Sequence, residues 1–154
     1  MARLDRMSPR LQEHFLNMPC PAFDTEPWVT GPPLAERRVA LISTAGLHRR
    51  DDRPFSPGSL EYRRIPADTP PEELVMSHVS TNFDRTGFQQ DWNVVFPLDR
   101  LREMAAAGVI GSLARDHYSF MGAIGDVLAL ERPVGALAKT MQAEGVDTAL
   151  LVPV

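Results

Sequence analysis

Residues 38–44 read Arg-Val-Ala-Leu-Ile-Ser-Thr, a short apolar run that the turn-forming pair Ala45-Gly46 brings to an end. A continuous apolar run of this length, bounded by a turn, is typical of a strand that is buried on both faces of a sheet. Three later runs have the same character and cover residues 74–79, 109–113 and 148–152. The sequence therefore predicts a sheet built around these apolar strands.

Two helices are predicted between the later strands, at residues 97–107 and 133–144. Each opens on a proline and closes on a glycine, and a Gly-Val step leads from each helix toward the next strand. Short joints of this kind, together with apolar strands, are typical of a parallel sheet with helices on its faces. We expect an α/β fold with an open, mostly parallel sheet and helices on both faces, similar to half of a flavodoxin- or Rossmann-like domain.

The chain divides at about residue 34. Residues 1–34 are predicted to form an N-terminal arm, with a short helix from Pro9 to Met18 and then an extended, proline-rich stretch. We expect this arm to pack on the domain through Phe23 and Trp28. Residues 35–154 are predicted to form a single α/β domain, with polar surface loops at 48–62 and 80–93.

Composition limits the possible partners. The chain has 154 residues, 44% of them hydrophobic, and a net charge of −4, so it lacks the basic face that nucleic acid or an anionic membrane attracts. No run approaches the ~20 apolar residues of a membrane span, and the N-terminus lacks the apolar core of a signal peptide. Cys20 is the one cysteine, which excludes an internal disulfide and a Cys-x-x-Cys motif. We expect a cytoplasmic protein.

Three histidines follow three of the predicted strands near their carboxyl ends, where parallel sheets bind ligands. They are His48, His78 and His117, and Asp84 and Asp116 lie in the same loops. The histidines are candidate ligands for one divalent transition metal (zinc, iron or copper), with either aspartate as a fourth ligand or as a hydrogen-bond partner that orients a ligating histidine. Alternatively they serve as acid, base and anion contacts for a small substrate, or are unrelated polar loop residues.

Nucleotide cofactors are not expected, because the glycines near residues 44–46 and 121–125 are too sparse for a phosphate-binding or dinucleotide motif. Cys20 stands between two prolines, with no neighbouring base or helix N-terminus to lower its thiol pKa. Thiol chemistry at this residue is therefore not expected.

Several segments together resemble the selenoprotein B family of glycine, sarcosine, betaine and D-proline reductases, and the likeness is greatest to the D-proline branch. The resemblance covers roughly residues 30–154 and rests on Val39–His48, Tyr62–Pro66, Ser77–Val79, Phe96–Glu103, Ser119–Gly122 and Glu144–Asp147. It implies a shared rim of the domain formed by Gly46, His48, His78, Asp84 and the helix start at 96–99. Gly46 is the candidate cofactor contact in this rim, and His48, His78 and Asp84 are the candidate catalytic residues.

The resemblance also implies a selenocysteine, with a cysteine close behind it, directly after the last predicted strand. The sequence given stops there, at Pro153-Val154. We therefore expect neither a selenocysteine nor a thiol or selenol reductase activity from this chain by itself.

Two functions follow as hypotheses, with a purely structural role as a third. The first is a metal-dependent oxidoreductase, or a related enzyme, that uses the histidine rim on a small amino-acid-like substrate. The second is a non-catalytic module that binds such a ligand or completes a reductase-like partner subunit. A homodimer is also expected, because the apolar run 148–152 would lie at or near an open sheet edge. Histidines that converge on one point would favour the first hypothesis.

Overall fold

The computed structural model describes residues 3–81 and 83–154. Its strands are β1 (Arg38–Ser43), β2 (Leu47–Arg49), β3 (Arg63–Pro66), β4 (Leu74–Met76), β5 (Ser112–Leu113), β6 (Asp116–Ser119) and β7 (Thr148–Val152). Its α-helices are α1 (Pro9–Leu16), α2 (Thr86–Gln90), α3 (Leu98–Ala106) and α4 (Glu131–Ala143). Short 3-10 turns lie at Leu4–Arg6, Leu34–Glu36, Pro71–Glu73, Trp92–Val94 and Val127–Leu130.

The main sheet is organised around β1. Strand β7 pairs with β1 in parallel along one side, while β5 and β6 share the other side as two parallel pieces. Strand β3 then pairs antiparallel with β6. The predicted α/β class with a mostly parallel sheet is confirmed, and the last predicted strand forms as expected at residues 148–152.

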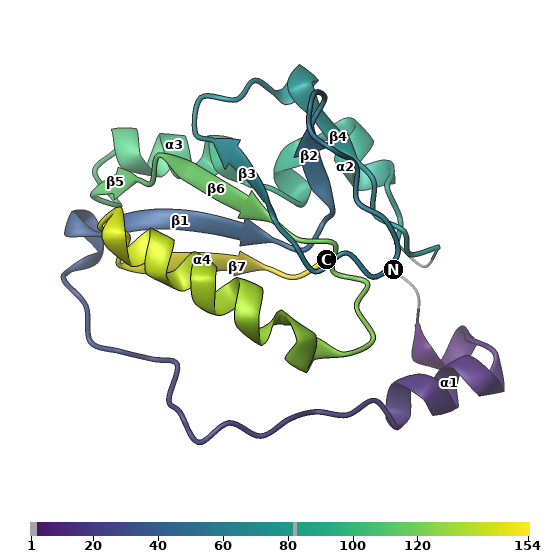
Figure 1. Cartoon of the computed structure of the whole chain (residues 1–154). Coiled ribbons are helices and arrows are strands. Elements are labelled where there is room, and N and C mark those ends of the chain that lie inside the picture. The colour runs from purple at the N-terminus through teal and green to yellow at the C-terminus, as the bar shows by residue number, and fades with distance from the viewer. Residues whose placement is uncertain (1–2, 82) are drawn as a thin grey trace.

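Helices cover the two faces of this sheet (Figure 1). On one face Ala40, Tyr118 and Phe120 pack with Leu137 and Met141 of α4. On the other face a larger cluster contains Val39 and Leu41 of β1 together with residues of α3 and of the turn before it: Trp92, Val95, Phe96, Leu98 and Leu101. Side chains that alternate along β1 therefore pack into two separate cores, one on each face of the sheet.

Three strand predictions differ from the structure. The run 74–79 forms a strand only at β4, which lies outside the main sheet and pairs antiparallel with β2. Strands β2 and β3 lie in or beside segments that are predicted as loop. The sequence does not indicate them, because each strand is short and contains charged residues. The run 109–113 contributes only β5, and most of that side of β1 is covered by β6.

The arm is helical at α1, and residues 17–33 contain no helix or strand (Figure 1). Phe23 is 69% exposed and Trp28 is 90% exposed. The prediction that these two aromatic residues pack on the domain is wrong, because the extended segment runs clear of the sheet. Among the described residues, no helix combines the length and the apolar composition that crossing a membrane requires.

Candidate functional site

Three chain segments meet beyond the carboxyl end of β1. The turn after β1 donates from the Gly46 amide to the carbonyl of Phe120 at 2.8 Å. The Gly46 carbonyl accepts from the amide of Ser77, just after β4, at 3.0 Å. The segment after β7 joins through the Val154 amide, which donates to Thr44 Oγ1 at 2.8 Å. This is the edge at which parallel sheets place their ligands.

A cavity of about 490 Å³ opens at this edge. The loop after β4 contributes His78, Ser80, Phe83 and Asp84, and the segment after β7 contributes Pro153 and Val154. Val94 and Val95 form a further apolar wall, and Met7 and Phe15 of the arm complete it. The cavity therefore combines apolar walls with two ionisable side chains, His78 and Asp84.

His78 is a buried, neutral imidazole. Its Nδ1 accepts a hydrogen bond from the Ser80 amide at 3.2 Å, so the proton of the neutral ring sits on Nε2. Nε2 is buried and has no protein partner. Burial lowers the pKa of His78, and the positive charge of Arg85, which donates to the His78 carbonyl, lowers it further. The ring thus offers an unused N–H donor at neutral pH.

Asp84 is exposed and ionised. Its Oδ1 accepts from the Thr86 amide at 2.9 Å at the start of α2. Hydrogen bonds from Thr86 lower the pKa of Asp84 below its usual value. The carboxylate is therefore held at the cavity by its own turn to the Thr86 amide and carries a full negative charge at neutral pH.

Gly46 supports this site from beneath. Its φ of +64° lies in the left-handed region, and a Cβ built on it would lie 3.0 Å from both Cα and N of His78. Only glycine combines that backbone conformation with so close an approach to a neighbouring chain. Its observed role is therefore to let the turn after β1 pack against the backbone of His78.

The other two histidines lie away from the cavity. His48 on β2 bonds through Nδ1 to the Arg49 carbonyl at 2.7 Å, with the ring against Phe55. His117 on β6 is fully buried against Phe96. His78 contacts a third phenylalanine, Phe83. The predicted site residues are thus only partly brought together: His78 and Asp84 share one cavity and Gly46 adjoins it.

Within residues 3–81 and 83–154, no three His, Cys, Asp or Glu side chains are grouped so that they could hold a metal. Asp116, the other expected ligand, bonds to Arg64 at 2.5 Å instead. The Nε2 atoms of His48, His78 and His117 are nevertheless all buried without a protein partner. The three-histidine metal site stays a prediction.

His117 has a structural position that the sequence did not indicate. Between Val39 and Ile42, β1 advances by three residues while its neighbour advances by five, from Leu113 to Tyr118. The ladder is interrupted there, and His117 Nδ1 accepts the Leu41 amide at 2.9 Å in place of a backbone carbonyl. Burial, aided by the charge of Arg102, lowers the pKa of His117 to about 4.

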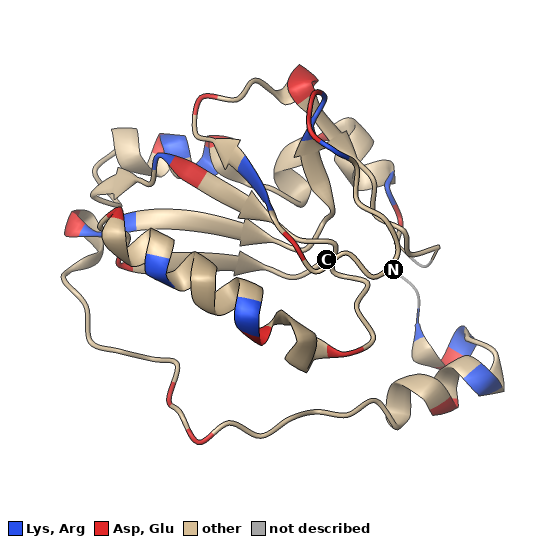
Figure 2. Cartoon of the chain, in the orientation of Figure 1, with Lys and Arg blue, Asp and Glu red and all other residues tan. Residues whose placement is uncertain are grey.

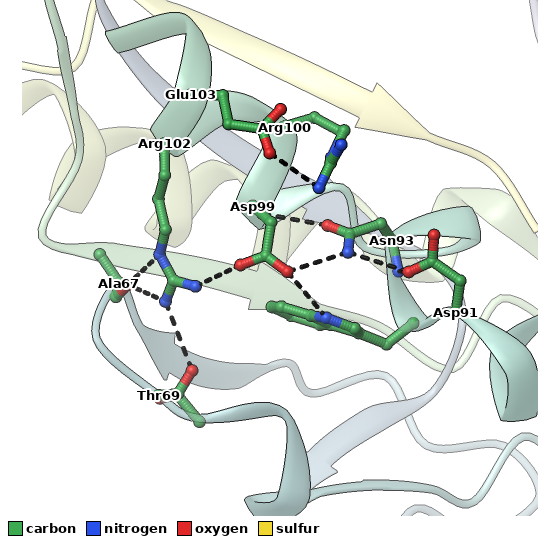
Figure 3. A network of polar contacts seen from close by, with 9 residues as sticks. Ala67, Thr69, Asp91, Asn93, Asp99, Arg100, Arg102 and Glu103 are labelled. Atoms are coloured by element: carbon green, nitrogen blue, oxygen red, sulfur yellow. Dashed lines mark hydrogen bonds and ion pairs between the residues drawn. The ribbon is translucent and has the colours of Figure 1, made fainter. Parts of the chain in front are cut away.

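A second polar network, which the sequence revealed only as a helix start, surrounds Asp99 (Figure 3). Asp99 Oδ2 accepts from Trp92 Nε1 and Asn93 Nδ2, both at 3.0 Å. Asp99 Oδ1 accepts from Arg102 at 2.6 Å, and Arg102 also donates to the carbonyls of Ala67 and Thr69. The network fastens α3 to the loop after β3.

Comparison with known proteins places this geometry in context. Residues 16–154 match the family model for glycine/sarcosine/betaine reductase selenoprotein B. The chain is 34% identical over 120 residues to D-proline reductase subunit gamma of Acetoanaerobium sticklandii, which covers 77% of the chain and 49% of that relative.

Two glycine reductase complex component B gamma subunits are also similar. The identity is 27% over 147 residues for Peptoclostridium acidaminophilum and 29% over 143 residues for Carboxydothermus hydrogenoformans. These alignments cover 91% and 87% of the chain but 33% and 32% of the relatives. The chain thus spans between a third and a half of the relatives that it matches, and no solved structure matches it.

Proposed function

Since the chain belongs to the glycine/sarcosine/betaine reductase selenoprotein B family, we propose that it is the small-ligand-binding part of a reductase-type complex. The ligand occupies the cavity lined by His78, Asp84 and Val154. The ligand is amino-acid-like, of the type that the names of the relatives give: D-proline, glycine, sarcosine or betaine. The chain holds this ligand while the redox groups come from elsewhere in the complex.

The observation that carries the proposal is that a neutral histidine and a carboxylate line the same apolar cavity. The Nε2–H of neutral His78 lacks a protein partner, and a turn of the ring toward the cavity would let it donate to a ligand carboxylate oxygen. The exposed carboxylate of Asp84 suits the amine or ammonium group of the same ligand. Phe83, Val94 and Val154 provide apolar contact for a small ring or methyl groups. Ligand pockets commonly have this composition.

Calorimetric titration with D-proline, glycine, sarcosine and betaine tests this proposal. We expect saturable binding of at least one of the four by the full chain. Asp84→Asn removes the charge opposite the amine and should weaken that binding about 10-fold or more. His78→Gln should also weaken it, because the imidazole donor is displaced.

Matched controls are available for both substitutions. Asp126 also caps a turn, and its Oδ1 accepts from the Leu128 amide at 3.0 Å, but it lies outside the cavity. His48 has a buried, unpartnered Nε2 as His78 has. Asp126→Asn and His48→Gln should leave the affinity within about twofold, since exposed and remote changes seldom act on a distant site. No binding of any of the four compounds at millimolar concentration would refute the proposal.

A metal-dependent oxidoreductase is the second candidate. One specific observation favours it: Nε2 of His48, His78 and His117 is buried without a protein partner, and neutral imidazole nitrogen is a common metal ligand. Elemental analysis of protein purified without a nickel column separates this candidate from the first. About one divalent ion per chain would support the metal-dependent oxidoreductase.

Two further parts of the proposal concern assembly and location. We propose contact with a reductase-like partner subunit, because the matched relatives are named as subunits of reductases. We further propose a homodimer, because within the described residues the apolar strand β7 pairs with β1 on one side only. We also propose a cytoplasmic location, which the lone Cys20 supports, since disulfides are rare in that compartment. Fractionation of the native organism and size measurement of the purified chain test these parts.

A further inference from the structure

The outer edge of β7 is open. Strand β7 pairs with β1 along Thr148–Val152, and no other strand within the described residues pairs with it. The strand contains no charged residue and no proline, and its ribbon carries neither charge colour in Figure 2. Natural edge strands are usually protected by charges, prolines, bulges or a covering segment. The arm gives no such cover, because residues 17–33 form no strand.

Both faces of β7 present apolar side chains beside this edge. Leu151 is 66% exposed and Leu150 is 38% exposed. Leu151 pairs with Ile42 and Ala149 pairs with Ala40, so these four side chains share the face that α4 covers. A groove of about 280 Å³ lies on this face between α4 and the sheet, and Ala149, Val134, Ala138 and Met141 line it. The exposed Leu151 therefore lies on the same face as the groove, two residues after Ala149, which lines it.

We propose that a second copy of the chain pairs antiparallel with β7 about a two-fold axis at Leu150. The five-residue strand pairs along its full length only with this centre, which sets Thr148 opposite Val152 and Ala149 opposite Leu151 of the other copy. Each Leu151 then lies over the other copy's Ala149 and fills its groove. The two α4 helices lie on the same face of the continuous sheet.

Self-complementarity favours a second copy as the occupant. A two-fold interface must match the same patch to itself, and here a large side chain meets a small one twice in a single register. Because β7 is uncharged, the pairing brings no like charges together. A centre at Ala149 would set Asp147 opposite Leu151, and a centre at Leu151 would set Ala149 opposite Pro153, so either displacement shortens the ladder. The alternative occupant is the additional polypeptide that the longer relatives carry.

Sedimentation equilibrium of the full chain over micromolar concentrations tests the dimer. We expect a monomer–dimer equilibrium, and amide exchange protection of residues 148–152 that grows with the dimer fraction. Leu151→Lys places two charges in the interface and should weaken dimerisation at least about 100-fold. Leu16→Lys is the matched control: Leu16 is 70% exposed on α1, and its substitution should leave the dimer unchanged.

A paired exchange tests the register. Leu151→Ala should weaken the dimer, Ala149→Leu should weaken it by placing two leucines opposite each other, and the double variant should restore it. Circular dichroism checks that each variant is folded. A strict monomer, a dimer that resists Leu151→Lys, or a double variant that stays monomeric would each overturn the proposal. These readouts require no ligand, so they stand or fall independently of the cavity at His78.

Discussion

His117 offers a decisive test of how the sheet is held together. Its Nδ1 accepts the Leu41 amide at 2.9 Å, where the ladder between β1 and β6 is interrupted, and its ring is fully buried. His117→Ala removes the acceptor and leaves a cavity beside Phe96. Stranding a buried N–H costs about 1–3 kcal/mol, and removing a buried ring adds a cavity cost of similar size. We expect a loss of about 4 kcal/mol in the free energy of unfolding, which is a large part of the stability of a small domain.

The pH dependence follows from the burial of the same ring. The pKa of folded His117 is lowered to about 4 from an ordinary value of 6.5. Folding therefore favours the neutral ring, and this stabilisation is complete above about pH 6.5 and is lost as the pH falls toward 4. Between pH 7.5 and pH 5 the linkage amounts to about 2 kcal/mol. The wild-type protein should lose that amount beyond any loss from other groups.

Urea unfolding of the wild type, His117→Ala and His117→Asn at both pH values measures these quantities. Asparagine keeps an acceptor near the position of Nδ1 and does not titrate. His117→Asn should therefore retain more stability than His117→Ala at pH 7.5, and it should lack the extra loss of about 2 kcal/mol at pH 5. A loss below about 1 kcal/mol in His117→Ala, or equal pH slopes in wild type and His117→Asn, would refute the structural role.

Three further predictions use simpler measurements. Asp99→Ala removes the acceptor of Trp92 Nε1 and one bond each from Asn93 and Arg102, and it should lower the free energy of unfolding by about 2–3 kcal/mol in urea, whereas Asp91→Ala, at an exposed turn, should cost about 1 kcal/mol or less. Cys20 is exposed, and Cys20→Ser should change stability by less than about 0.5 kcal/mol and leave ligand binding intact. The second candidate function predicts about one divalent transition metal per chain in elemental analysis, lowered by an alanine change at any of the three histidines; a chain that takes up neither zinc, iron nor copper contradicts that candidate.

Much of the fold could be read from local patterns. Residues 38–44 and 148–152 formed strands where their continuous apolar runs predicted them. The two helices predicted to start near Pro97 and Pro133 also formed, and each ends shortly before a glycine. These signals are local, because a proline, a glycine or an apolar run restricts its own backbone wherever the segment lies. The α/β class follows from their order along the chain.

Strand pairing was decided only in three dimensions. Asp116 and His117 are polar and give no strand signal, yet β6 forms because Arg64 neutralises the carboxylate and the Leu41 amide satisfies the imidazole. Their partners lie 52 and 76 residues away in the sequence. No window of the sequence contains both members of such a pair, so burial of these polar groups was not predictable.

The candidate site divides in the same way. The sequence by itself indicated that His78 and Asp84 follow a strand and that Gly46 ends one, because strand ends and turns are local features. Only the tertiary structure set His78 and Asp84 beside Val154 in one cavity and sent His48 and His117 to other neighbours. The physical reason is that β2 and β4 form a separate two-stranded sheet, so His48 and His78 lie outside the main sheet while His117 lies within it on β6.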